Sequence, residues 1–327
     1  MHVLLGFFSM LLIFLGSYLL LRLLRRVNDW SQRRMMQLAV LAMPIVILGL
    51  GIGGLHHFIG RLCLTGIPFW DILLGVFLPL GMTAVALGAF GLGLVRLVLM
   101  RRVVARNSAF IHPDLQIRVN DLGQLLHSVR PRVLLCVYNR PVALTCGIFR
   151  PTILLSTWMV EHLDQRELEA VLVHEMEHVA RRDYLVVWLS MVLRDAFFYV
   201  PTCRMAYRQL QHEKELACDE LTARVTQRPL ALASALAKVW QNAVAEPRFA
   251  AFGAAQPLVK GEEVIHGRIE RLLSFSSVKT TMQPSHVHAF RTKIVALGTL
   301  LVVQSTNIVI ILALLRCNPL ALLEKLL

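Results

Sequence analysis

The sequence predicts a multi-pass α-helical membrane protein that carries one cytoplasmic α+β domain. Hydrophobic residues make up 56% of the 327 residues, and the mean hydropathy of +0.60 is high for a soluble enzyme. Long apolar runs bracket a stretch, residues 105–291, in which charges and turn-forming residues are frequent. No apolar run within that stretch is long enough to cross a bilayer, so we expect it to form a single domain outside the membrane.

Three apolar runs, residues 3–21, 35–59 and 72–95, precede this domain and are each long enough to cross a bilayer as a helix. They make up a predicted membrane segment of residues 1–104. A cleaved signal peptide is the competing interpretation of the first run, but no basic segment precedes it and no small-residue cleavage pattern follows it. A fourth run, residues 294–315, lies in the last segment, 292–327, and leaves a short tail.

Arginines follow the first and third runs, between Arg22 and Arg34 and between Arg96 and Arg106. Positively charged loops stay in the cytoplasm, so this pattern predicts an outside N-terminus, a cytoplasmic domain and an outside C-terminus. The net charge of +13 would also suit nucleic acid, but membrane topology explains the arginine clusters more simply. We therefore expect the lipid bilayer, and no nucleic acid, as a partner.

The domain begins with a predicted helix over residues 120–130 and a small sheet. Short β-rich runs at residues 133–138, 142–146 and 152–156 are separated by turn-forming stretches. Asp164 followed by Glu167 predicts a capping box at the start of the next helix, whose apolar residues recur at helical spacing. Further helices are expected over residues 184–200, 201–225 and 229–245. The six cysteines show no C-x-x-C spacing, so neither a disulfide framework nor a Cys-type zinc site is predicted.

The first chemical motif is His174-Glu175-Met176-Glu177-His178, an H-E-x-x-H arrangement on the capped helix. Histidines four residues apart project from one helical face, so both imidazoles can reach one metal ion, and Glu175 points to its open side. Neutral imidazoles are typical zinc ligands, and zinc-bound water has a pKa of about 7. The competing interpretation, an amphipathic helix with two incidental histidines, is disfavoured by a second motif.

That second motif is Glu215-Leu216-Ala217-Cys218-Asp219 on the 201–225 helix. Glu215 is the candidate third ligand, and Asp219, one turn later, is placed to bond the outer nitrogen of a ligand histidine. Glu213 and Glu220 compete with Glu215, but neither has an aspartate four residues later. A solvated acidic helix face is the alternative.

The spans, both motifs and Arg181-Arg182-Asp183 together resemble the BlaR/MecR-type antirepressor metallopeptidase family of the gluzincin class. The resemblance implies a cytoplasmic α+β gluzincin-like domain in a bacterial-type inner (plasma) membrane, with one Zn²⁺ per chain. It implies an endopeptidase that acts on a polypeptide such as a cytoplasmic repressor, or on itself. Members that sense β-lactams carry an external sensor domain after the last span. The short tail here predicts that a membrane sensor partner, the short loops or packing among the spans conveys any signal.

Gluzincins pair an extended substrate with an edge strand beside the metal helix, and the resemblance assigns this role to Val142, Ala143, Leu144, Thr145 and Cys146. Glu175 is then the general base. The oxyanion stabiliser is open among His212, Tyr207 and Arg208.

Two other functions compete. One is an HtpX-like quality-control protease, which shares both motifs. The other is a membrane signalling scaffold with a structural zinc site, but such sites use four protein ligands and leave Glu175 without a role.

Overall fold

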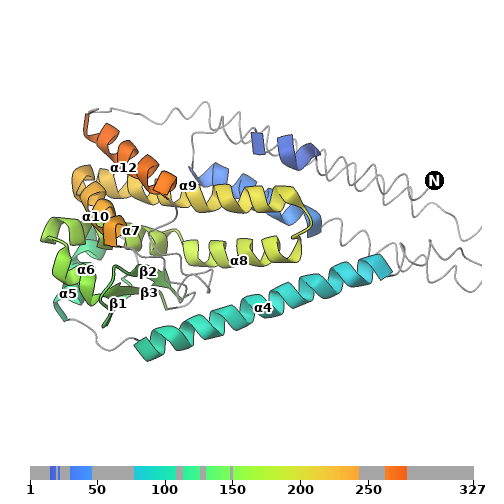
Figure 1. Ribbon diagram of the computed structural model, residues 1–327, viewed down its shortest axis with the longest axis horizontal. Coiled ribbons are helices and arrows are strands. Elements are labelled where there is room, and N and C mark those ends of the chain that lie inside the picture. The colour runs from blue at the N-terminus through green and yellow to red at the C-terminus, as the bar shows by residue number, and fades with distance from the viewer. Residues whose placement is uncertain are drawn as a thin grey trace, which may run out of the picture. The chain divides into compact units, whose positions relative to one another are not determined.

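A computed structural model describes residues 15–19, 21–22, 30–45, 77–107, 113–125, 130–147, 150–242 and 262–277 (Figure 1). The described residues form two units. One holds the described residues before position 90 together with residues 193–208, and the other holds the described residues of 90–192 and 209–283. The candidate site lies in the second unit, which is described below.

Three strands form the small sheet that the β-rich runs predicted: β1 (Arg132–Cys136), β2 (Ala143–Cys146) and β3 (Thr152–Ser156). Their order is β1-β3-β2, with β1 parallel and β2 antiparallel to the central strand. Strand β2 is therefore an edge strand of this described sheet. Gly147 ends it with φ of +94°, a left-handed conformation that favours glycine.

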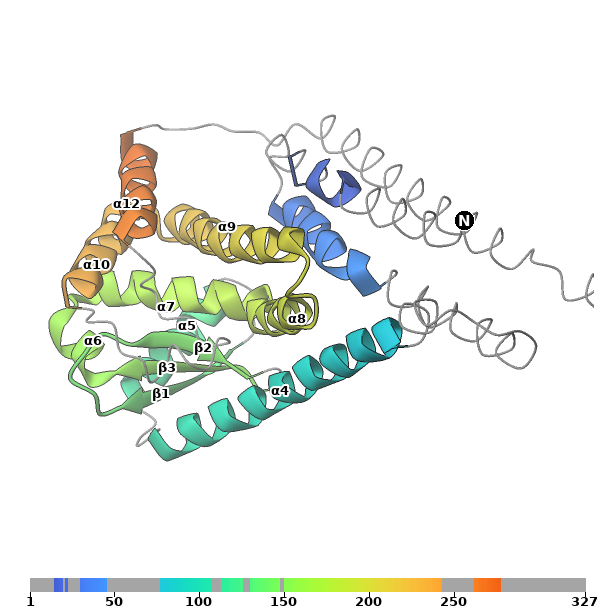
Figure 2. The ribbon, with the colours of Figure 1, turned by 45° about the vertical axis from the view of Figure 1, so that its right-hand side comes forward.

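The two faces of the sheet have different partners because side chains alternate along each strand. One face, which includes Val133, Ala143 and Ile153, packs on helices α5 (Pro113–Leu125) and α7 (Gln165–Ala180), and α10 (Pro229–Asn242) extends the same core by packing on α7. The other, which includes Leu144 and Leu154, packs on Met100 of α4 and on Tyr184 of α8. Figure 2 shows α7 lying along the sheet, so the helix that bears H-E-x-x-H is fixed by the main core.

The remaining helices are α4 (Leu78–Asn107), α6 (Thr157–His162), α8 (Asp183–Ala196), α9 (Pro201–Thr226) and α12 (Glu262–Ser277). Helices over the 201–225 and 229–245 stretches are confirmed to within a few residues. The predicted start of α5 near residue 120 was wrong. The helix already begins at Pro113, because proline is suited to a first helical turn, where its missing N–H costs nothing.

Helix α4 is the one described helix long and apolar enough to cross a membrane, over Leu80–Arg106. The third apolar run ends at residue 95, yet the helix continues through Arg96, Arg101 and Arg102. Arginine is a good helix former, so hydropathy marks the apolar stretch and not the helix end. A described helical stretch, residues 30–45, includes the start of the second run. Most of the first run, the end of the second, the fourth run and the C-terminal tail lie outside the described residues.

The predicted capping box at the start of α7 is confirmed. Asp164 Oδ1 accepts from the Glu167 backbone N–H at 2.8 Å, and Glu167 Oε2 accepts from the Asp164 backbone N–H at 2.9 Å. Glu167 also accepts hydrogen bonds from Ser234 (2.6 Å) and Lys238 (2.7 Å) of α10. Burial raises the pKa of Glu167, but the Lys238 and Ser234 hydrogen bonds outweigh it, so this pKa is lowered. One carboxylate thus caps α7 and joins it to α10.

Glu167→Gln should lower the free energy of unfolding by about 2 kcal/mol near neutral pH, the scale of a hydrogen bond to a charged group. Because the folded-state pKa lies below the unfolded one, this stabilisation is present above the unfolded pKa of about 4.3 and is lost as pH falls through the folded value. Thermal melts should show the gap between wild type and variant closing at acid pH. Glu169→Gln is the control, since Glu169 pairs with exposed Arg228 at 3.5 Å and such pairs contribute little.

Candidate metal centre

Helix α7 brings its two histidines together as the sequence spacing predicts. The rings of His174 and His178 have centroids 4.8 Å apart and planes at 90°. His174 is fully buried and His178 is nearly so. Met176 and Val179 of the same helix face the hydrophobic core. Core packing on one side of α7 therefore fixes the direction in which the imidazoles point.

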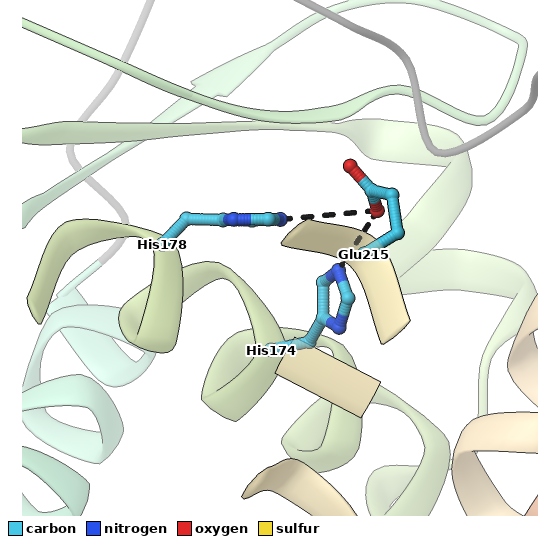
Figure 3. A group of neighbouring side chains, drawn as sticks. All are labelled: His174, His178 and Glu215. Atoms are coloured by element: carbon cyan, nitrogen blue, oxygen red, sulfur yellow. Dashed lines mark ion pairs between the residues drawn. The ribbon is translucent and has the colours of Figure 1, made fainter. Parts of the chain in front are cut away.

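Helix α9 supplies the third side chain. Glu215 Oε2 lies 3.5 Å from His174 Nε2 and 3.9 Å from His178 Nε2, and the three groups point toward one another in Figure 3. One ligand atom from each residue lies within 4.8 Å of the others. Glu220, one of the competing candidates, pairs instead with Arg224 at 2.6 Å and Arg271 at 3.3 Å. The described structure thus groups Glu215, and not Glu220, with the histidines.

These three residues fit a divalent metal ion. His174 Nε2 is buried and has no hydrogen-bond partner among the described residues, which is costly for a polar atom. Burial alone lowers the pKa of His174, yet Asp219 and Glu215 raise it to about 9. The surroundings therefore favour positive charge at this ring, and a metal ion would supply it. Two imidazoles and a carboxylate are also the protein ligands of one common type of catalytic zinc site.

Each histidine has a carboxylate at its outer nitrogen. Asp219 Oδ1 lies 3.1 Å from His174 Nδ1, the position expected from the second motif. Asp183 Oδ2 lies 2.9 Å from His178 Nδ1. Such carboxylates fix the tautomer and the orientation of a ligand histidine. Asp183 received no role from the sequence. It reaches His178 because Arg182, with φ of +54°, reverses the chain between α7 and α8.

Arg268 of α12 is the other site residue that the sequence did not single out. Its side chain is 1% exposed and donates to both carboxylate oxygens of Asp219 at 2.7 Å. Its Nη1 atom also lies 3.3 Å from Glu215 Oε2. A bidentate arginine fixes the plane of a carboxylate, so Arg268 orients Asp219 toward His174. The sequence did contain a hint of this role, because Arg268 lies at helical spacing between the apolar residues Ile265 and Leu272. All three residues lie on one buried face of α12.

We predict that Asp219→Asn weakens metal affinity about 10- to 100-fold, the usual cost of losing such an outer-shell partner. The amide keeps the shape but loses the charge that supports His174 and pairs with Arg268. Competition titration with a chromophoric chelator measures the effect. Glu220→Gln, one residue along α9, should bind metal as wild type does. Equal affinity of Asp219→Asn and wild type would give Asp219 a purely structural role.

The candidate base and the edge strand meet beside this centre. Glu175 is buried, and Thr145 Oγ1 of β2 donates to its Oε2 atom at 2.7 Å. Val142 directly precedes the strand and is bonded to Ser156 of β3. Ala143, Leu144 and Cys146 are buried, whereas Thr145 is partly exposed. The candidate edge residues therefore run alongside the metal helix, with Thr145 in direct contact with Glu175.

The candidate oxyanion stabilisers have other surroundings. The Tyr207 ring lies under the guanidinium of Arg194, 4.5 Å from its centroid. Burial and the charges of Arg268 and Arg271 lower the pKa of His212, so its imidazole is neutral at pH 7. The described contacts assign an oxyanion role to neither residue, nor to Arg208.

The described cysteines, Cys136, Cys146, Cys203 and Cys218, are free and buried. Burial raises the pKa of Cys146 to about 12 and that of Cys218 well above its ordinary value. Cys218 Sγ lies 3.2 Å from His178 Nδ1, and the two form a second close group with Asp183. Protonated thiols are poor nucleophiles, so Cys146 and Cys218 do not act as nucleophiles at this site.

Two histidines four residues apart on one helix, a carboxylate between them and an acid from another helix form an arrangement that is typical of metallopeptidase sites. A family comparison agrees with this class. The BlaR1 peptidase M56 model matches residues 81–272. The chain belongs to that family, which confirms the resemblance seen in the sequence.

Individual relatives match over shorter stretches. Protease HtpX homolog 1 of Streptomyces coelicolor is 28% identical over 173 residues, covering 42% of this chain and 56% of the relative. Methicillin resistance mecR1 protein of Staphylococcus aureus is 26% identical over 82 residues, covering 25% of this chain and 14% of the relative. A mecR1 protein of Staphylococcus epidermidis matches to the same extent. The chain thus spans about half the length of the first relative and less of the others.

Proposed function

We propose that this protein is an integral-membrane, zinc-dependent endopeptidase that cleaves peptide bonds on the cytoplasmic side. The observation that carries the proposal is the position of Glu175, a buried carboxylate between two histidines that converge with Glu215. A structural zinc site would use a fourth protein ligand and would have no role for this carboxylate. The ligands would be His174, His178 and Glu215, with one zinc ion per chain.

Zinc in this site would supply a Lewis acid and lower the pKa of the attacking water toward 7. Glu175 accepts a proton from that water and later delivers it to the nitrogen of the leaving amine. Strand β2 pairs with the extended substrate through backbone N–H and C=O groups, so recognition depends more on extended conformation than on one side chain. Asp219 and Asp183 keep the ligand imidazoles oriented throughout.

The cytoplasmic location rests on α4. Its apolar part would cross the bilayer of a bacterial-type plasma membrane, and its arginines would stay on the inner side. Leu97 and Met100, which follow the first of these arginines, pack on the same cluster as Leu144 and Leu154 of the sheet. Trp188 Nε1 of α8 also donates to the Gly93 carbonyl at 2.9 Å. The domain would therefore sit directly at the inner end of this span.

We predict that an impermeant maleimide labels Cys317 in intact cells and does not label a Val137→Cys variant until the membrane is permeabilised. Val137 is the suitable position because it is 74% exposed, whereas the neighbouring Cys136 is 3% exposed and would react poorly on either side. Mass spectrometry of labelled peptides identifies the sites. External labelling of Val137→Cys would invert the proposed topology.

Quantitative proteomics of newly formed protein termini tests the function. Cells carrying wild type and Glu175→Gln are compared, and termini found only with wild type identify the substrates. One cytoplasmic repressor, or the protein itself, would indicate signal-dependent regulation. Many membrane proteins would favour the HtpX-like quality-control function, which the similarity to Protease HtpX homolog 1 supports. Identical termini in both strains would contradict the peptidase function and would favour the membrane signalling scaffold with a structural zinc site.

A further inference from the structure

We propose that Thr145 is a positioning residue that holds the Glu175 carboxylate by one oxygen and leaves the other free for proton transfer. The inference rests on the proposed peptidase function and deepens it. It begins with one short contact, the 2.7 Å hydrogen bond from Thr145 Oγ1 to Glu175 Oε2. The same hydroxyl lies 3.1 Å from the Glu175 backbone carbonyl. Thr145 thus touches both the side chain and the backbone of the base.

The strand register directs Thr145 to this position. Ala143 and Thr145 lie on the same face of β2, and Ala143 packs in the cluster that contains the core side of α7. Leu144 and Cys146 point the other way, into the cluster with Met100 and Tyr184. Thr145 is the partly exposed member of this four-residue strand. Since a branched side chain has few χ1 rotamers in a strand, its hydroxyl is held toward Glu175.

The contact gives the two carboxylate oxygens of Glu175 different surroundings. Glu175 Oε2 accepts from Thr145, whereas no hydrogen bond to Oε1 occurs among the described residues. We therefore assign proton transfer to Oε1. A water proton moves to Oε1 as the water oxygen bonds to the scissile carbonyl carbon. The same proton then moves to the amide nitrogen as the C–N bond breaks, which yields a carboxylic acid and an amine and restores the Glu175 carboxylate; the acid then loses its proton to solvent.

The same contact ties the base to the substrate strand. In the proposed function the backbone of β2 pairs with the extended peptide, and the Thr145 side chain extends from that backbone to the base. Misplacement of a reacting group by a fraction of an ångström is costly to catalysis. Substrate pairing and base orientation would therefore depend on the same four residues.

Thr145→Val and Thr145→Ser separate the hydroxyl from the shape of the side chain. Valine keeps the branched shape that suits a strand, so the variant should fold and bind zinc at wild-type stoichiometry. Its kcat on a reporter peptide should fall about 10-fold or more, the loss expected for a hydrogen bond to a charged group, while KM changes little. Serine keeps the hydroxyl and should restore most of kcat. Thr152→Val, the same change on β3 where the hydroxyl bonds the Arg150 carbonyl, should match wild type.

A measurement without turnover tests the contact itself. Thermal melts of Thr145→Val, Glu175→Ala and the double variant should show non-additive losses in melting temperature, because either single change already removes the shared hydrogen bond. Additive losses, or a normal kcat in Thr145→Val, would overturn the positioning role. A normal kcat in Thr145→Val beside an inactive Glu175→Gln would refute this inference alone. Normal turnover in Glu175→Gln would instead refute the proposed function.

Discussion

Glu175→Gln is expected to keep its fold and its zinc while losing peptide hydrolysis about 10²-fold or more, the usual contribution of a general base. The amide is nearly isosteric with the carboxylate and can still accept the Thr145 hydrogen bond through its oxygen. It cannot take a proton from water near neutral pH. Since Glu175 is not one of the three converging ligand residues, metal binding and catalysis should separate in this variant. Elemental analysis and single-turnover kinetics on the same preparation measure both.

The matched control is Glu177→Gln on the same helix. Glu177 occupies the variable position of the motif next to His178 and is absent from the groups of converging metal ligands. It should therefore retain both zinc and turnover. A Glu175→Gln enzyme with near-normal turnover would remove Glu175 from the mechanism. Loss of zinc in that variant would mean that the carboxylate supports the metal and not the proton transfer.

The spacing of residues along single helices predicted part of the candidate site. The capping box of Asp164 and Glu167 and the pair His174 and His178 depend on residues three or four apart on one helix. The structure places them as that spacing requires. The predicted position of Asp219 beside His174 follows from the same rule applied to α9. Helical periodicity carries this information because it does not depend on the rest of the fold.

The residues that were missed depend on contacts between distant elements. Arg268 meets Asp219 across 49 positions of sequence, and no spacing rule links an arginine on one helix to an acid on another. Asp183 reaches His178 only through the left-handed turn at Arg182. Thr145 lay inside the candidate edge strand, but its hydrogen bond to Glu175 depends on which strand face meets α7. Tertiary packing decides each of these contacts, so they emerge only from the three-dimensional structure.

His174→Ala and Glu215→Ala are each expected to abolish stoichiometric metal binding, whereas the wild-type protein should contain about one zinc per chain, as three-ligand catalytic sites do. Each change leaves two protein ligands, and each removes an atom from the group within 4.8 Å. Peptidase activity should fall with the metal. A ligand that binds only the folded state raises stability, so a chelator should lower the melting temperature of wild type and leave both variants unchanged.

His266→Gln is the control for losing an imidazole, because this exposed histidine of α12 packs beside Trp240 with ring centroids 5.5 Å apart. It should contain as much zinc as wild type and show the same response to chelator. Full zinc in both His174→Ala and Glu215→Ala would show that the ligand set is wrong. Zinc lost from His174→Ala but kept in Glu215→Ala would retain the histidines and transfer the third position to another acid, for which Glu213 on the same helix is the next candidate. Elemental analysis of Glu213→Ala beside Glu215→Ala then decides which acid of α9 binds the metal.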